Sequence, residues 1–308
     1  DVCRWSNECE LRRRKDDHLS LIAGASASQR TELESQGFST VAAFAALSSP
    51  LPFKPARGSA ESYERLRLQA EIQVRGREAG EFLFERLALE PDRGLQSLPE
   101  PSPGDVFFDI ESDQYVGEGG IEYLFGWGWF DEGGTWRYES RWGMDRSGER
   151  TAFEAFIDAM TERRAQYPDM HIYHFAPYEP SAVKRLMGRY ATREAEIDTF
   201  LRGKVFVDLL AVTRAAIRAS VESYSLKKLE PFYGYERQID LPDANKALLH
   251  LAAGLELDDV PSITPDIRDA VERYNEDDCR STAELRRWLE EIRTEAIADG
   301  ETLTRPEL

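Results

Sequence analysis

The stretch Val106-Phe107-Phe108-Asp109-Ile110-Glu111 decides the fold, because an apolar run ends there in two carboxylates. A short apolar run bounded by turn-forming residues predicts a buried strand. Side chains alternate along a strand, so Asp109 and Glu111 are expected on the same face. Two acidic groups on one face of a core strand indicate that this strand carries part of a polar site.

A third acidic residue falls on the inward face of a late helix. We predict a helix near Asp266–Ile292 whose apolar residues recur on one side. These residues are Ile267, Val271, Tyr274, Leu285, Leu289 and Ile292. Asp278 lies on the same side, four residues after Tyr274. A buried carboxylate is costly unless a cation or a strong hydrogen-bond donor accompanies it. With Asp109 and Glu111, Asp278 therefore indicates a metal site.

The segments around these residues alternate between strands and helices. The turn Asp131-Glu132-Gly133-Gly134 predicts a hairpin between strands Ile121–Phe130 and Trp136–Trp142. Later segments are a helix near Glu149–Gln166 and strands at His171–Phe175 and Val205–Leu209. A hairpin followed by alternating helices and strands predicts an α/β fold with a mixed five-stranded sheet flanked by helices.

The other parts of the chain differ in composition. The Pro-rich segment Leu98–Gly104 predicts a linker before the α/β domain, which we place at 104–295. A helical stretch from Ser59 to about Leu89 is expected within the connector 51–103. The remaining predicted parts are a polar segment at 1–17, two short helices within 18–50 and a tail at 296–308.

The charge of the chain restricts its interactions with nucleic acid. The net charge of −18 over 308 residues argues against a protein that coats nucleic acid generically. Between Lys184 and Lys228, however, ten basic residues accompany five acidic ones. This stretch is either a solvated helical surface or a track for phosphates. On the second interpretation, Lys227 and Lys228 are expected nucleic-acid contacts, and His174, outside this stretch, is expected to approach a phosphate.

The cysteines and the hydropathy indicate the compartment. Three cysteines, Cys3, Cys9 and Cys279, do not make a disulfide framework, which favours a reducing cytoplasm. No run approaches the roughly 20 apolar residues of a membrane span, so no membrane partner is expected. A chain that begins at Asp1, with two cysteines close to it, is expected to be a piece of a longer protein.

The motifs resemble the DEDD exonuclease superfamily of the ribonuclease H-like fold, in its tyrosine-containing DEDDy branch. The resemblance rests on Asp109-Ile110-Glu111 as an Asp-x-Glu motif and on Tyr274 to Asp278 as a Tyr-x-x-x-Asp motif. Where that family usually has an aspartate after its fourth strand, this chain has Glu179. The resemblance covers about residues 104–295.

Further stretches resemble the YprB-type ribonuclease H-like domain, which is often joined to a RecB-like nuclease in longer bacterial proteins. They are Phe108–Glu111, His174–Pro180, Ser223–Leu229 and Tyr274-Asn275. The opening Cys3–Cys9 resembles the cysteine-rich end of a RecB-like module, so we interpret 1–17 as its remnant. Only two cysteines stand there and four thiolates usually hold an iron–sulfur cluster, so none is expected in this fragment. The implied partners are the missing RecB-like nuclease and a helicase region.

The resemblance also implies a catalytic centre. It assigns Asp109, Glu111, Glu179 and Asp278 as ligands of two Mg²⁺ or Mn²⁺ ions, which prefer carboxylate oxygens. Two such ions clamp the attacking and leaving oxygens during phosphodiester hydrolysis. Tyr274, one turn before Asp278, would orient the attacking water.

Several of these residues have simpler interpretations. Glu179 precedes a proline and is consistent with a plain helix start. Asp208 either faces the site or caps the next helix, and His171 and His174 are consistent with packing residues. Cys279 points about 100° away from Asp278 around the helix, which indicates a structural role.

The segment within 18–50 resembles a helix-hairpin-helix element, which offers backbone amides to a DNA phosphate. It contains Gly24-Ala25-Ser26 and Gly37, with Ser26 where the hairpin usually has a second glycine. A purely structural helical pair and a DNA contact both remain open.

Three functions are consistent with these patterns. The first is a metal-dependent 3′–5′ exonuclease of single-stranded or frayed DNA, with RNA as a second substrate class. An alternative is a catalytically weak nucleic-acid-binding module that supports an attached nuclease or helicase. A third is a metal phosphohydrolase that acts on a small substrate.

Overall fold

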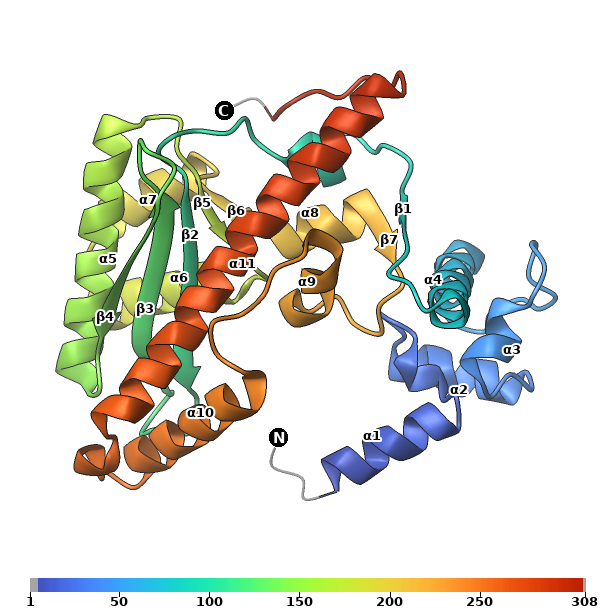
Figure 1. Ribbon diagram of the computed structural model, residues 1–308, viewed down its shortest axis with the longest axis horizontal. Helices are drawn as coiled ribbons and strands as arrows, with labels where there is room; N and C mark the ends of the chain where they lie inside the picture. The colour runs from blue at the N-terminus through green and yellow to red at the C-terminus, as the bar shows by residue number, and fades with distance from the viewer. Residues whose placement is uncertain (1–4, 307–308) are drawn as a thin grey trace. The chain divides into compact units, whose positions relative to one another are not determined.

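The chain divides into two compact units. Figure 1 colours the chain by residue number. The computed structural model describes residues 5–306, so Cys3 lies outside the described residues. The first unit contains residues up to Ala88 together with Ala216–Phe232, and the second contains Leu89–Ala215 and Tyr233 onward. No described helix combines the length and apolar character that crossing a bilayer requires.

Short helices around a small apolar core build the first unit. Its elements before the sheet domain are α1 (Ser6–Lys15), η1 (Leu19–Leu21), α2 (Ala27–Ser35), α3 (Val41–Ala45), α4 (Ala60–Ala79) and β1 (Phe84–Arg86). Residues Tyr63, Leu66 and Ala70 line one side of α4 and pack against Leu33 and Phe44. Their spacing of three and four residues is typical of an amphipathic helix.

The predicted hairpin region folds as two loops between short helices. Gly24 and Gly37 both adopt positive φ, which glycine accepts without strain. Ser26 caps α2, because its hydroxyl accepts from Gln29 N while the Gln29 side chain accepts from Ser26 N. A serine at this position therefore starts a helix. Contact of this region with DNA remains a prediction.

The helix of the connector, α4, ends earlier than predicted. Gly80, in the left-handed conformation, terminates α4, whereas we predicted a helix to about Leu89. The following residues form β1, which pairs antiparallel with β7 (Ile217–Ala219). Strand pairing with a segment over 130 residues away overrode the local helical preference, which is a weak determinant. The segment after β7 includes α9 (Leu226–Tyr233), which carries Lys227 and Lys228.

A five-stranded mixed sheet organises the second unit, as predicted. The strands are β2 (Val106–Asp113), β3 (Ile121–Phe130), β4 (Trp136–Trp142), β5 (Ile172–His174) and β6 (Phe206–Asp208). Their order across the sheet is β4-β3-β2-β5-β6. The first three strands pair antiparallel, while β5 and β6 run parallel to β2.

Helices cover both faces of this sheet (Figure 1). One face packs against α5 (Arg146–Gln166), α6 (Tyr178–Tyr190) and α7 (Glu194–Arg202). On that side Phe108 stacks on Phe156 of α5, with ring centroids 3.9 Å apart. Val106, Phe108 and Ile110 of β2 belong to this core. Because strand side chains alternate, Asp109 and Glu111 point to the opposite face, away from the main apolar core.

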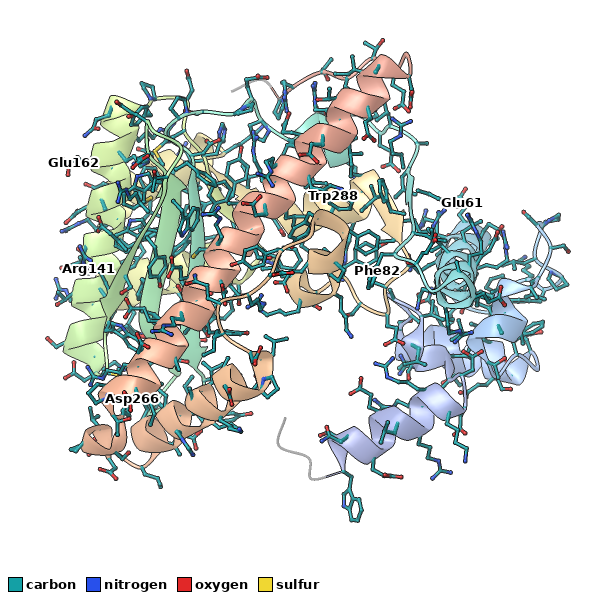
Figure 2. The ribbon with its side chains drawn as sticks, in the orientation of Figure 1. Glu61, Phe82, Arg141, Glu162, Asp266 and Trp288 are labelled. Carbon is teal, nitrogen blue, oxygen red and sulfur yellow. The ribbon has the colours of Figure 1, made fainter. Side chains whose placement is uncertain are left out.

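The long helix α11 (Pro265–Ala298) lies across that opposite face (Figure 1). Thr264 caps its start and Pro265 occupies its first turn, so α11 begins as helix-start rules predict. Figure 2 labels Asp266 in the first turn of this helix and Trp288 further along it. The remaining elements of this part are α8 (Leu209–Ala216), α10 (Leu241–Glu256), η2 (Gly94–Ser97) and η3 (Val260–Ser262). Packing of α10 on α11 completes an apolar cluster that includes Leu251 and Val271.

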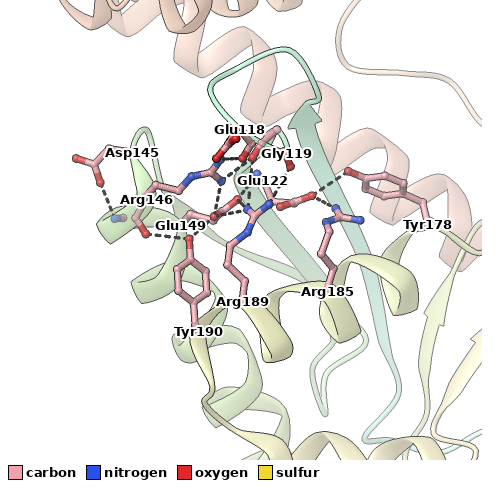
Figure 3. A network of polar contacts seen from close by, with 12 residues as sticks. Glu118, Gly119, Glu122, Asp145, Arg146, Glu149, Tyr178, Arg185, Arg189 and Tyr190 are labelled. Atoms are coloured by element: carbon pink, nitrogen blue, oxygen red, sulfur yellow. Dashed lines mark hydrogen bonds and ion pairs between the residues drawn. The ribbon is translucent and has the colours of Figure 1, made fainter.

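A buried polar network joins β3 to α5 and α6 (Figure 3). Glu149, fully buried, accepts hydrogen bonds from Glu122 N at 2.7 Å and from Arg189 Nη1 at 3.0 Å. Arg146 and the Tyr190 hydroxyl donate to the same carboxylate. Burial alone would raise the pKa of Glu149, but hydrogen bonds, above all the one with the Glu122 side chain and then those from Tyr190, Glu122 N and Arg146, outweigh it and lower that pKa. Glu149 is thus a charged anchor between the hairpin and the helices.

The pKa of Glu122, in the same network, is shifted in the opposite direction. Burial raises its pKa, and Glu149 raises it further, although Arg185 opposes both effects. A carboxyl with a raised pKa stabilises the fold most below its unfolded pKa, near 4.5, and this stabilisation is lost as pH rises through the raised value. Glu122→Gln, which mimics the neutral form, should therefore gain stability relative to the unsubstituted protein as pH rises from about 4 to about 8. Urea denaturation across that range measures this.

Glu118→Gln is the control, because Glu118 is an exposed acid in the turn just before β3. Its stability should follow that of the unsubstituted protein with pH. The prediction about Glu122 is wrong if both variants keep a constant difference from the unsubstituted protein at every pH.

Candidate metal centre

Three acidic side chains from distant parts of the sequence converge on the α11 face of the sheet. Asp109 and Glu111 on β2 and Asp278 on α11 each offer an oxygen within 4.8 Å of the others. Asp278 is 6% exposed, and the other two are half-buried. We call these three residues the acidic cluster. The strand and helix periodicity predicted the inward orientation of each, and the packing of α11 on β2 brings them together.

The local geometry of β2 explains why two acids share this site. Asp109 pairs with Gly126 of β3 and Glu111 pairs with Leu124, in continuous antiparallel register. The register shifts between Glu111 and Ser112, immediately after the second acid. The alternation therefore holds as far as Glu111 and keeps both carboxylates on one face.

The fourth predicted ligand, Glu179, is not a member of the acidic cluster. It lies in the first turn of α6 and is 4% exposed. Its Oε2 is 3.5 Å from His174 Nδ1 at the end of β5. Burial raises the pKa of Glu179, and His174 partly opposes that shift. Because β5 runs parallel to β2, α6 begins at the edge of the sheet toward which β2 runs.

The predicted nucleic-acid contacts lie in different surroundings. His174 is 2% exposed, and its Nδ1 donates to Ala176 O at 2.6 Å. Lys227 and Lys228 lie on α9, in the first unit. The contacts of all three with nucleic acid remain predictions.

Tyr274 lies one turn before Asp278, as predicted, and is half-buried. The guanidinium of Arg237 lies over its ring, 5.6 Å from the centroid.

Two other candidate residues have structural partners. Asp208 accepts from Leu210 N and Ala211 N and therefore caps α8. The Cys279 thiol, fully buried, donates to Gly126 O at 3.4 Å, and burial raises its pKa well above the ordinary value.

Asn275 lies at the site, and the sequence analysis named it within the resemblance but gave it no role. It is fully buried, and its Nδ2 donates to Asp109 Oδ2 at 2.8 Å. The Tyr138 hydroxyl donates to Asn275 Oδ1 at 2.8 Å, which orients the amide. A supporting hydrogen bond of this kind fixes the direction of a ligand carboxylate. Its signal in the sequence is a polar residue four positions after Val271, on the buried side of the helix.

Gly126 leaves the space that this amide fills. A Cβ at this position would lie 1.7 Å from Asn275 Oδ1 and 2.5 Å from the Tyr138 oxygen. We expect Gly126→Ala to destabilise the protein by about 2 kcal/mol, because backbone or amide must shift. Displacing the amide should also lower any metal-dependent activity about 10-fold, since Asp109 loses its orienting donor. Thermal denaturation and strand-cleavage rates measure the two effects.

Gly188→Ala on α6 is the matched control, because nothing lies within 4 Å of its added Cβ. That variant should keep both stability and activity. If Gly126→Ala changed neither the stability nor the cleavage rate, Asn275 would have no fixed role in orienting Asp109.

Two further residues are close to Asp278. Arg237 Nη2 lies 2.6 Å from Asp278 Oδ1, and both side chains are below 10% exposed. The neighbouring Asp277, fully buried, accepts from the Tyr235 hydroxyl and from Gln238 N. Arg237 comes from an irregular segment without periodicity, so no pattern in the sequence pointed to it.

The donor chemistry of the acidic cluster fits a hard divalent cation. Three carboxylates supply the oxygen ligands that Mg²⁺ and Mn²⁺ prefer. One carboxylate is fixed by Asn275, so its direction is set before a cation binds.

Comparison with known proteins identifies a superfamily for the part of the chain that carries the sheet. A model of the RNase H superfamily matches residues 106–290, which span the five strands of the sheet and most of α11. This match supports the ribonuclease H-like fold that the sequence predicted. No curated protein and no solved structure matches the chain significantly.

Proposed function

Because the chain belongs to the RNase H superfamily, we propose that it is a metal-dependent 3′–5′ exonuclease. Its expected substrate is single-stranded or frayed DNA, with RNA as the second substrate class. Superfamily membership supports a nuclease that hydrolyses phosphodiester bonds. The DEDDy subtype and the direction of digestion come from the motif resemblance.

The convergence of Asp109, Glu111 and Asp278 within 4.8 Å carries this proposal. We propose these three as holders of Mg²⁺ or Mn²⁺, with Glu179 as a further candidate. A bound divalent ion would neutralise phosphate charge and favour formation of a hydroxide nucleophile.

The protein's own residues then have distinct tasks. Asn275 holds the Asp109 carboxylate in one orientation through its amide. Tyr274 is the proposed donor or acceptor that orients the attacking water, since it lies one turn from Asp278. An attached RecB-like nuclease, a helicase region and a cytoplasmic setting remain proposals from the resemblance.

Strand digestion with labels at either end tests the activity. A 5′-labelled single strand should shorten progressively in Mn²⁺, while a 3′-labelled strand should release its label at once. EDTA should stop both reactions, because the carboxylates need the divalent ion. Cleavage at internal positions would contradict an exonuclease, and intact strands at every protein concentration would contradict a nuclease.

The position of Glu179 favours one alternative, a catalytically weak nucleic-acid-binding module. Glu179 lies beside His174 and is not in the acidic cluster. Tight strand binding that persists in EDTA, without cleavage, would support this alternative. If Glu179 is a further holder of the ion in an active nuclease, Glu179→Gln should slow strand cleavage; an unchanged rate would exclude it from catalysis.

A further inference from the structure

A buried arginine belongs to the candidate metal centre. The Arg237 side chain is 7% exposed, and its Nη2 lies 2.6 Å from Asp278 Oδ1. The guanidinium also lies over the Tyr274 ring. Arginine remains protonated at any pH that the folded protein tolerates, so this positive charge is permanent. The acidic cluster therefore always has a cation of the protein beside it.

The chain holds this arginine in place from both sides. Asp277 accepts from the Tyr235 hydroxyl at 2.7 Å, before Arg237 in the sequence. The same carboxylate accepts from Gln238 N at 3.0 Å and Ile239 N at 3.2 Å, after it. Asp277 is fully buried on α11, next to Asp278. The irregular segment is thus tied to the helix that carries the ligand, which fixes where the guanidinium lies.

The charges of the centre match one divalent ion better than two. The acidic cluster carries three negative charges when ionised, and Arg237 offsets one of them. Glu179 lies outside the acidic cluster, so two negative charges of the cluster remain, and they balance a single Mg²⁺ or Mn²⁺. A second ion bound to Asp278 would lie close to the guanidinium, because Arg237 Nη2 is only 2.6 Å from Asp278 Oδ1. Like charges a few ångströms apart repel strongly in a partly buried site.

We infer that Arg237 takes the place of a second metal ion in this centre. One divalent ion is held by Asp109, Glu111 and Asp278, and Arg237 supplies the other positive charge that faces a substrate phosphate. Guanidinium groups suit this task because their geometry matches that of a phosphate. This inference rests on the proposed function and departs from the two-ion centre that the resemblance implies.

Counting bound Mn²⁺ tests the inference without measuring catalysis. Metal-free protein is titrated with Mn²⁺, and the electron paramagnetic resonance signal of free Mn²⁺ gives the number of ions bound. We expect one ion on the unsubstituted protein and two on Arg237→Met. The first ion should also bind Arg237→Met about 10-fold more tightly, because the competing cation is gone. Arg237→Lys keeps the charge and should still bind one ion.

Arg273→Met is the matched control. Arg273 lies on α11 near Tyr274, has a 56% exposed side chain and pairs with Asp269. Arg273→Met removes one arginine charge, as Arg237→Met does, but at an exposed position, and should leave one ion bound. Circular dichroism identifies variants that remain folded, and Arg237→Lys tests the stoichiometry if Arg237→Met does not fold.

Two ions on the unsubstituted protein, or the same count in Arg237→Met and Arg273→Met, would overturn the inference. An increase to two ions in Arg237→Lys would overturn it as well. These results are independent of strand cleavage. A protein that digests strands with two bound ions refutes only the role of Arg237, whereas one bound ion without any digestion refutes only the proposed nuclease.

Discussion

Asp109→Asn should lower Mn²⁺-dependent strand cleavage by about 1,000-fold or more, because it removes one of the three carboxylates that we propose as holders of the ion. The fold should survive. Asn275 Nδ2 now donates to Asp109 Oδ2, and an amide oxygen at the same place accepts that hydrogen bond equally well. We therefore expect the free energy of unfolding to change by less than about 1 kcal/mol. Strand digestion and urea denaturation measure the two quantities.

Asp269→Asn is the matched control for this variant. Asp269 lies on α11, has a 59% exposed side chain and undergoes the same chemical change. It should keep full cleavage. If Asp109→Asn digests strands as fast as Asp269→Asn, the acidic cluster is not the catalytic centre.

Asp278→Asn should destabilise the metal-free protein by about 3 kcal/mol, because it leaves Arg237 without its anionic partner in a buried place. From the sequence alone, this substitution should leave folding nearly intact, since it removes a buried charge. The ion pair with Arg237 reverses that expectation. The midpoint of urea denaturation in EDTA gives the measurement.

A double-mutant cycle separates the ion pair from other effects of the substitution. Asp278→Asn combined with Arg237→Met removes both charges, so the double variant should be more stable than the sum of the single losses predicts. We expect a coupling of about 2 kcal/mol. Additive losses would show that Asp278 and Arg237 do not stabilise each other.

Much of the fold could be predicted because its signals are local. The strands Ile121–Phe130 and Trp136–Trp142 have the predicted bounds, since alternation and a hairpin turn define them within a few residues. The end of α4 could not be predicted in this way. β1 depends on pairing with β7, and a distant partner leaves no mark on the local pattern.

The candidate site likewise combines residues that local patterns predicted with residues that they did not. Periodicity placed Asp109, Glu111 and Asp278 on inward faces, because each orientation depends only on its own strand or helix. Asn275 lies on the buried side of the same helix, but its task depends on an aspartate 166 positions away. Arg237 reaches Asp278 from an irregular segment, where no period constrains a side chain.

The sequence by itself determined where the five strands of the main sheet and the long last helix occur along the chain, and the inward direction of three carboxylates. Both follow from neighbours a few residues away. Only the tertiary structure decided that Arg237 pairs with Asp278, that Asn275 holds Asp109, and that Glu179 lies beside His174 and not in the acidic cluster. These contacts depend on how α11, the irregular segment and the sheet pack together, and packing of distant elements is not encoded in any local pattern.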